Sequence, residues 1–113
     1  VDDMRGFASA SARVLEAGGY EVEVAGDGIE ALEILRAAPP GGFDVLLTDL
    51  DMPRMGGIDL IIEAKRAGLV RRYLAMTADP TQGIRQTLEV MGVPLIEKPF
   101  DGAALSALVA VNV

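Results

Sequence analysis

Hydrophobic and polar positions follow each other along this chain with two different spacings. From Met4 to Ala17 apolar or small residues recur at helical spacing and two glycines follow, so this stretch predicts a helix. Residues 43–48, FDVLLT, form an almost continuous apolar run, which is typical of a buried strand. The two patterns together predict helices over residues 4–17, 29–37, 58–67, 81–91 and 101–111, and strands over residues 20–25, 43–48, 73–77 and 94–97.

After the first helix, the predicted strands and helices follow one another as four strand-helix units. Such alternation predicts right-handed crossovers and a doubly wound α/β fold, in which helices cover both faces of a parallel sheet. A further strand is expected before the first helix, but Val1 alone represents it, so we expect the first strand to be largely missing from the sequence. With 113 residues and no linker or repeat, residues 1–113 are expected to form one domain that is incomplete at its N-terminus.

Composition and charge exclude several classes of function. Aromatic residues make up only 4% of the chain, which leaves few rings for stacking on bases, and the net charge of -7 repels phosphate backbones. Direct binding to nucleic acid is therefore not expected. The chain has no cysteine and no histidine, so it has no disulfide, thiolate or imidazole chemistry of its own. No membrane span or signal peptide is visible, and we expect a cytoplasmic protein that does not contact a membrane.

Polar residues stand where the predicted strands end. Asp2 and Asp3 follow the remnant of the first strand, Asp49 ends the strand over residues 43–48, Thr77 ends the next one, and Lys98 follows the last. Ligands of open parallel sheets bind at the carboxyl ends of the strands, so these side chains are expected to lie close together. Carboxylates that converge repel one another unless a cation joins them, and Mg²⁺ prefers oxygen ligands of this kind.

Each of these residues also has an ordinary structural explanation. A lone aspartate after a strand is usually a turn former or a helix N-cap, as we expect for Asp27 and Asp101, and a lone lysine is usually a solvated charge. Three acids, a threonine and a lysine at successive strand ends favour a site instead. Thr77 and Lys98 suit a phosphoryl group, and an aspartate can act as the nucleophile in phosphoryl transfer. The basic residues between 65 and 72 are better explained as a solvated helix end.

Four pieces of the chain resemble, in order and nearly in spacing, the receiver domains of two-component response regulators, such as chemotaxis receivers. These pieces are Asp2-Asp3, LLTDLDMPRMGG at 46–57, MTAD at 76–79 and EKPF at 97–100. The resemblance implies a flavodoxin-like, five-stranded parallel sheet of order 2-1-3-4-5. It also implies that Asp49 is the phosphoacceptor and that Thr77 and Lys98 contact the phosphoryl group. The implied ligands of Mg²⁺ are Asp3, Asp49 and the backbone carbonyl of Asp51, with Asp2 assisting through a coordinated water.

Three positions depart from the family pattern or vary within it. Leu95 stands where many receivers have Tyr or Phe, so a switch that depends on an aromatic ring does not transfer directly to this chain. Asp51 and Asp79 lie two residues after Asp49 and Thr77, at positions where the family varies and adjusts the lifetime of the phosphoryl group. The resemblance also leads us to expect a cis peptide bond between Lys98 and Pro99, which is uncommon for proline in general.

The function implied by the resemblance is a phosphorylation-dependent signalling switch in a two-component system or phosphorelay. Asp49 would accept a phosphoryl group from a sensor histidine kinase or a histidine phosphotransfer protein, and catalysis would be limited to accepting and losing that group. The phosphorylated chain would then act on an effector domain or a downstream protein, or would form a dimer. The chain would be either a stand-alone receiver or a part of a larger regulator.

Two other functions compete with this one. The DLDMP sequence also resembles the nucleophile motif of haloacid-dehalogenase-like phosphatases, in which Asp49 would attack phosphate and Asp51 would be a general acid. Against this, that motif sits on the first strand of a longer chain, and Met52-Pro53 breaks its tail. The other alternative is a receiver-like scaffold that is never phosphorylated, and the complete set of acids, threonine and lysine argues against it.

Overall fold

The computed structural model describes residues 1–39 and 41–113, and it places the five predicted helices close to their expected bounds. Three of the four predicted strands form. In chain order the elements are α1 (Arg5–Ala17), α2 (Gly28–Ala37), β1 (Phe43–Asp49), α3 (Gly57–Ala67), β2 (Val70–Thr77), α4 (Gln82–Met91), β3 (Leu95–Glu97) and α5 (Gly102–Asn112).

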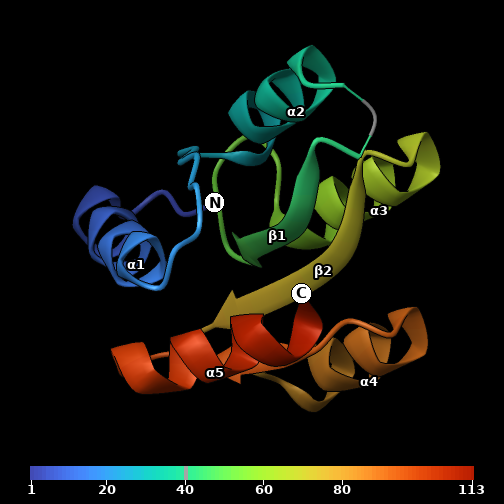
Figure 1. The fold of residues 1–113 in the computed structure, drawn as a ribbon. Coiled ribbons are helices and arrows are strands. Elements are labelled where there is room, and N and C mark those ends of the chain that lie inside the picture. The colour runs from blue at the N-terminus through green and yellow to red at the C-terminus, as the bar shows by residue number, and fades with distance from the viewer. Residues whose placement is uncertain (40) are drawn as a thin grey trace.

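The three strands form one parallel sheet of order β1-β2-β3, and Figure 1 shows its neighbouring strands β1 and β2. In the strand register Asp49 of β1 pairs with Met76 of β2, and Thr77 of β2 pairs with Glu97 of β3. The ends of all three strands therefore meet at one edge of the sheet. This register places Asp49, Thr77 and Lys98 beside one another, as the alternating pattern predicted.

Side chains of the sheet alternate between two hydrophobic clusters. Leu46 of β1 and Ala75 of β2 pack into the larger cluster, which the buried faces of α2 and α3 complete. Leu74 of β2 lies on the opposite face, where Leu105 and Val109 of α5 bury it. In Figure 1, α2 and α3 accordingly lie on one side of the sheet, and α1 and α5 on the other. The doubly wound architecture is thus confirmed.

Local capping explains where three of the helices begin. The side chains of Asp27, Thr81 and Asp101 each accept a hydrogen bond from the backbone N–H three residues further on, at the start of α2, α4 and α5. These bonds satisfy backbone donors that have no partner within the helix. The N-cap roles expected for Asp27 and Asp101 are confirmed.

The prediction of a strand over residues 20–25 is wrong, because these residues are in neither strand nor helix. The five-stranded sheet expected from the resemblance is therefore represented by three strands among the described residues. A strand needs a hydrogen-bonded neighbour, and only Val1 and Asp2 lie between this segment and β1. The N–H of Asp2 donates to the carbonyl oxygen of Ala25 (3.0 Å), which is the one backbone hydrogen bond that joins the segment to them.

Val1 nevertheless occupies the place of a strand beside β1. Its amino group donates to the carbonyl of Leu47 (2.6 Å), and the N–H of Asp49 donates to the carbonyl of Val1 (2.8 Å). This is the pattern of a parallel ladder in which Val1 faces Thr48. Next to it lies a cavity of about 140 Å³, lined by α1, α2, β1 and residues 21–25. In the order 2-1-3-4-5, Val1 thus holds the place of strand 1, and β1, β2 and β3 correspond to strands 3, 4 and 5.

No helix among the described residues is both long and apolar enough to span a membrane.

Candidate functional site

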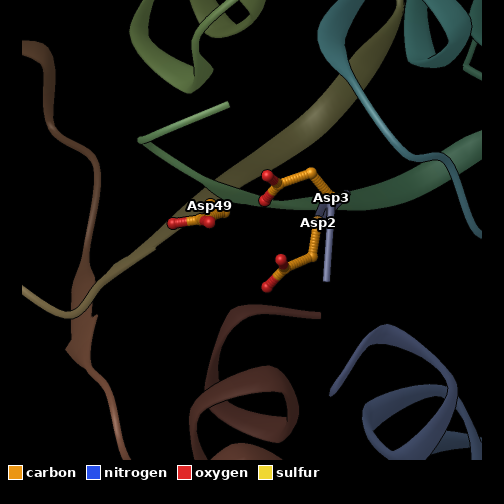
Figure 2. Close-up of side chains that lie close together, drawn as sticks. All are labelled: Asp2, Asp3 and Asp49. Atoms are coloured by element: carbon orange, nitrogen blue, oxygen red, sulfur yellow. The ribbon is translucent and has the colours of Figure 1, made fainter. Parts of the chain in front are cut away.

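Three aspartates converge at the carboxyl edge of the sheet. Asp2 and Asp3 precede α1 and Asp49 ends β1, and carboxylate oxygens from all three lie within 4.8 Å of one another. Figure 2 shows the three side chains gathered around one point. Asp2 and Asp49 are buried, whereas Asp3 is exposed. The site is therefore open to solvent on the side of Asp3.

Backbone contacts fix Asp2 at this position. Its N–H donates a hydrogen bond to the carbonyl oxygen of Ala25. Its Oδ1 accepts a hydrogen bond from the N–H of Met4 (2.9 Å), at the point where the chain turns into α1. Its other oxygen, Oδ2, faces Lys98. The acidic pair thus stands beside Asp49 because the chain reverses direction between the strand position of Val1 and the first helix.

Lys98 brings a side-chain ammonium group into the cluster. Its Nζ lies 2.6 Å from Oδ2 of Asp2 and 3.3 Å from Oδ2 of Asp49. The backbone N–H of Lys98 donates to the carbonyl oxygen of Thr77 (2.8 Å), which ties the segment after β3 to the end of β2. The Lys98–Pro99 peptide bond is cis, as expected. Three carboxylates therefore face a single lysine, and the cluster keeps an excess of negative charge.

The pKa values of Asp49 and Lys98 reflect this arrangement. Burial raises the pKa of Asp49 above its usual range, because the positive charge of Lys98, which opposes the effect, is partly offset by the negative charge of Asp2. For Lys98 burial disfavours the charged form, but the hydrogen bond to Asp2 and the charges of both carboxylates outweigh it and raise the pKa. At neutral pH the lysine stays charged, and the buried carboxylate of Asp49 favours any further positive charge.

Thr77 and Asp51 lie together on the neighbouring side of the site. The hydroxyl group of Thr77 is fully buried, donates to Oδ2 of Asp51 at 3.5 Å and accepts from the N–H of Asp79 at 3.2 Å. The first of these hydrogen bonds is long and therefore weak. Leu95, in the position where many receivers carry an aromatic ring, is half-buried and packs against the larger hydrophobic cluster.

The loop between β1 and α3 is held by contacts that sequence analysis did not find. Arg54 has a positive φ of 67° and forms two hydrogen bonds to the carboxylate of Asp27, at 2.8 and 3.1 Å. A Cβ on Gly57 would overlap the carbonyl oxygen of Asp49. Asp27 and Arg54 are distant in sequence, and nothing in the sequence signals their pairing. Only the two glycines in PRMGG indicated a tight backbone at this point.

Phe7 of α1 is a second feature that the sequence did not reveal. Its ring lies 4.4 Å from Nζ of Lys98, measured to the ring centroid, and stands edge-on to Phe100 with the ring centroids 5.3 Å apart. In the sequence Phe7 is simply one apolar position of a predicted helix. Its place beside the lysine follows from the packing of α1 against α5.

Comparison with known proteins agrees with this geometry. The family model described as the response regulator receiver domain matches residues 1–110. The response regulator MprA of Mycobacterium leprae is 34% identical over 111 residues, which is 97% of this chain and 46% of that protein. A response regulator receiver protein of Anaeromyxobacter is 48% identical over 78 residues, which is 69% of this chain and 32% of that protein. The chain thus spans a third to a half of the length of these relatives.

Solved structures give the same result for the fold. The chemotaxis protein CheY4 of Vibrio cholerae superposes with a TM-score of 0.85 at 27% identity, over 99% of this chain and 93% of that chain. The comparisons do not favour the haloacid-dehalogenase-like phosphatase. Together with the aspartates and lysine gathered at the carboxyl edge of a parallel sheet, they show that this chain belongs to the response regulator receiver domains, which are phosphorylation-dependent signalling switches.

Proposed function

We propose that Asp49 is the residue on which this receiver is phosphorylated. The observation that supports this most directly is the place of its carboxylate, which lies 3.3 Å from the ammonium of Lys98 and beside Asp2 and Asp3. Of the three acids in the cluster, Asp2 is engaged by both Lys98 and the N–H of Met4, and Asp3 lies on the exposed rim. Asp49 is the acid that ends a sheet strand, and its carboxylate also lies next to the lysine.

The donor set fits a magnesium ion. The side chains of Asp2, Asp3 and Asp49 supply oxygen atoms within 4.8 Å of one another, and their repulsion is relieved by a hard divalent cation. In this proposal Asp3, Asp49 and the backbone carbonyl of Asp51 hold the ion and Asp2 assists through a water molecule. When bound, Mg²⁺ supplies positive charge that offsets the negative charge of phosphoryl oxygens.

The residues of the chain have distinct roles in the transfer. A carboxylate oxygen of Asp49 attacks the phosphorus atom, the bond between phosphorus and the donor breaks, and the bonding electrons leave with the donor group. Lys98 exchanges its contact with Asp2 for a contact with a phosphoryl oxygen. Thr77 turns its hydroxyl away from Asp51 and donates to a second phosphoryl oxygen. Attack of water on phosphorus later releases inorganic phosphate and restores Asp49. Catalysis by this chain is limited to these two steps.

A phosphohistidine is the donor that the proposal requires in a signalling pathway. These 113 residues contain no histidine, so the donor group lies outside them, on a sensor histidine kinase or a histidine phosphotransfer protein. Residues 1–113 form the receiver domain, and the phosphorylated form acts on an effector domain or a downstream protein, or dimerises. The switch follows from the redirected contacts of Lys98 and Thr77.

Acetyl phosphate and Mg²⁺ test the proposal without any partner protein. We expect the intact mass of the wild-type chain to increase by one phosphoryl group that alkali removes, and we expect no increase for Asp49→Asn. Asp44→Asn is the matched control, because Asp44 lies on the same strand but is exposed and outside the cluster. Failure of the wild type to gain mass would support the scaffold, and rapid turnover of phosphate monoesters would support the phosphatase.

A further inference from the structure

The ammonium of Lys98 contacts two carboxylates and one aromatic ring. Nζ lies 2.6 Å from Asp2 and 3.3 Å from Asp49, and the face of the Phe7 ring covers it at 4.4 Å from the centroid. The side chain of Lys98 is 10% exposed. The ring therefore occupies much of the side of the ammonium that the acids leave free. Attraction between a cation and an aromatic face acts over distances up to about 6 Å, and shielding from water strengthens it.

The Phe7 ring is itself held in place by a second aromatic ring. Phe7 stands edge-on to Phe100, at an interplanar angle of 80° and a centroid distance of 5.3 Å. This is a favoured arrangement of two aromatic rings. Phe100 follows Lys98 by two residues, so the same short segment contacts Phe7 through both a ring and an ammonium. The close approach of α1 and α5 supports the arrangement, since a Cβ on Gly102 would lie 3.2 Å from the side chain of Val14.

We infer that Phe7 is a positioning residue for phosphorylation, whose ring face holds the ammonium of Lys98 beside Asp49; this inference rests on the proposed function. An aromatic face attracts positive charge but is no strong hydrogen-bond acceptor. Lys98 can therefore exchange an oxygen of Asp2 for a phosphoryl oxygen while it stays against the ring. A carboxylate or amide in place of Phe7 would compete for the same N–H groups, and an aliphatic side chain would contribute no attraction to the charge.

The competing explanation is that Phe7 only packs α1 against α5 through Phe100. Fluorinated phenylalanines separate the two explanations, because fluorine withdraws the negative charge of the ring face while it changes the shape of the ring little. We expect the rate constant for phosphorylation by acetyl phosphate at fixed Mg²⁺ to fall stepwise as position 7 carries one, three and five fluorines. The full loss should be about threefold to tenfold. A purely packing role gives no graded loss.

Phe43 provides the matched control. It is half-buried like Phe7 but lies at the opposite end of β1 from Asp49, against the larger cluster. The same series of fluorinated residues at position 43 is expected to leave the rate unchanged. An equal loss at positions 7 and 43 would overturn the inference.

A spectroscopic measurement reports on the contact itself. Nζ of Lys98 lies over the Phe7 ring, so we expect the ring current to shift the NMR signals of the neighbouring methylene protons upfield. Phe7→Leu should remove this shift, and Phe7→Tyr should keep both the shift and a rate near that of the wild type. If the wild type is phosphorylated at Asp49 but neither fluorination nor Phe7→Leu changes these quantities, the inference is wrong and the proposed function stands. A wild type that gains no phosphoryl group would overturn both.

Discussion

Asp49 carries a charge that its own surroundings disfavour. Burial raises its pKa although the ammonium of Lys98 lies 3.3 Å away, because the effect of that positive charge is partly offset by the negative charge of Asp2. A group with a raised pKa binds its proton more tightly in the folded state. Its contribution to stability is therefore present at acidic pH and is lost as the pH rises through the folded-state pKa. The strand end that suits phosphorylation is thus a weak point of the fold at neutral pH.

Asp49→Asn should consequently be more stable than the wild type at neutral pH when Mg²⁺ is absent. We expect a melting temperature that is higher by a few degrees, and a difference that disappears as the pH falls below the pKa of Asp49. Thermal unfolding in the presence of a chelator over a series of pH values measures both. Asp44→Asn, with its exposed side chain, should show no such difference. A less stable Asp49→Asn variant at neutral pH would contradict the assigned balance of charges.

Asp2 should behave in the opposite way. It is 1% exposed and accepts hydrogen bonds from both Lys98 and the N–H of Met4, so its removal leaves a buried ammonium with one carboxylate instead of two. We expect Asp2→Ala to lower the free energy of unfolding by about 3 kcal/mol, as measured by urea denaturation. Asp3→Ala is the control, because Asp3 is exposed, and it should change stability little. Equal effects of the two substitutions would contradict the different roles of the two acids.

At the scale of elements, local patterns predicted more than long-range ones. The helices were found because apolar spacing and capping residues such as Asp101 act within a few positions of the chain. β2 begins at Val70, three residues before the predicted start, because Val70 pairs with Phe43 although Arg71 and Arg72 interrupt the apolar run. Residues 20–25 have a strand-like pattern but no complete neighbouring strand. A sequence pattern shows that a segment can pair, and the fold decides whether a partner is present.

The site shows the same difference between what sequence patterns predict and what depends on packing. Asp2, Asp3, Asp49 and Lys98 were placed together correctly because the ends of parallel strands share one edge of a sheet. Phe7 was missed, because its role depends on how two helices pack, and that packing has no local signal in the sequence.

The turn after β1 depends on the absence of a side chain at Gly57. A Cβ there would overlap the backbone carbonyl of Asp49, and a backbone atom cannot move aside as a flexible side chain can. We expect Gly57→Ala to destabilise the chain by about 1–3 kcal/mol and to slow phosphorylation, because the displaced carbonyl belongs to the phosphoacceptor. Denaturation and the acetyl phosphate assay measure the two effects.

Gly83→Ala is the control for this substitution. Gly83 also lies in the first turn of a helix, but its nearest neighbour to a new Cβ is 4.0 Å away. Alanine there should stabilise the chain by about 0.4–1 kcal/mol and leave phosphorylation unchanged. If Gly57→Ala and Gly83→Ala had the same stability, the close approach of Gly57 to the carbonyl oxygen of Asp49 would not constrain the turn.

At the scale of the whole molecule, the edge of β1 away from β2 is paired only through Val1 among the described residues. The cavity of about 140 Å³ lies there, between α1, α2, residues 21–25 and the unpaired part of β1. An extension of four alternating valine and isoleucine residues fused before Val1 should pair with β1 and fill this space. We expect a gain of about 1.5–3 kcal/mol for each side chain that becomes fully buried, less the cost of ordering the backbone.

Urea denaturation distinguishes a paired extension from a disordered one. Pairing buries additional surface, so both the free energy of unfolding and its dependence on denaturant should increase. An extension of four glycine and serine residues is the matched control and should change neither. If the apolar extension also changed neither, the space beside β1 would not be a strand position.

Chemical trapping measures directly which residue of this chain is phosphorylated. Borohydride reduces an aspartyl phosphate to homoserine, which marks the modified position permanently. After treatment of the wild-type chain with acetyl phosphate, Mg²⁺ and then borohydride, peptide mass spectrometry should find homoserine at position 49. Homoserine at position 2, 3 or 51 instead, or its absence from the whole chain, would contradict the claim that Asp49 accepts the phosphoryl group.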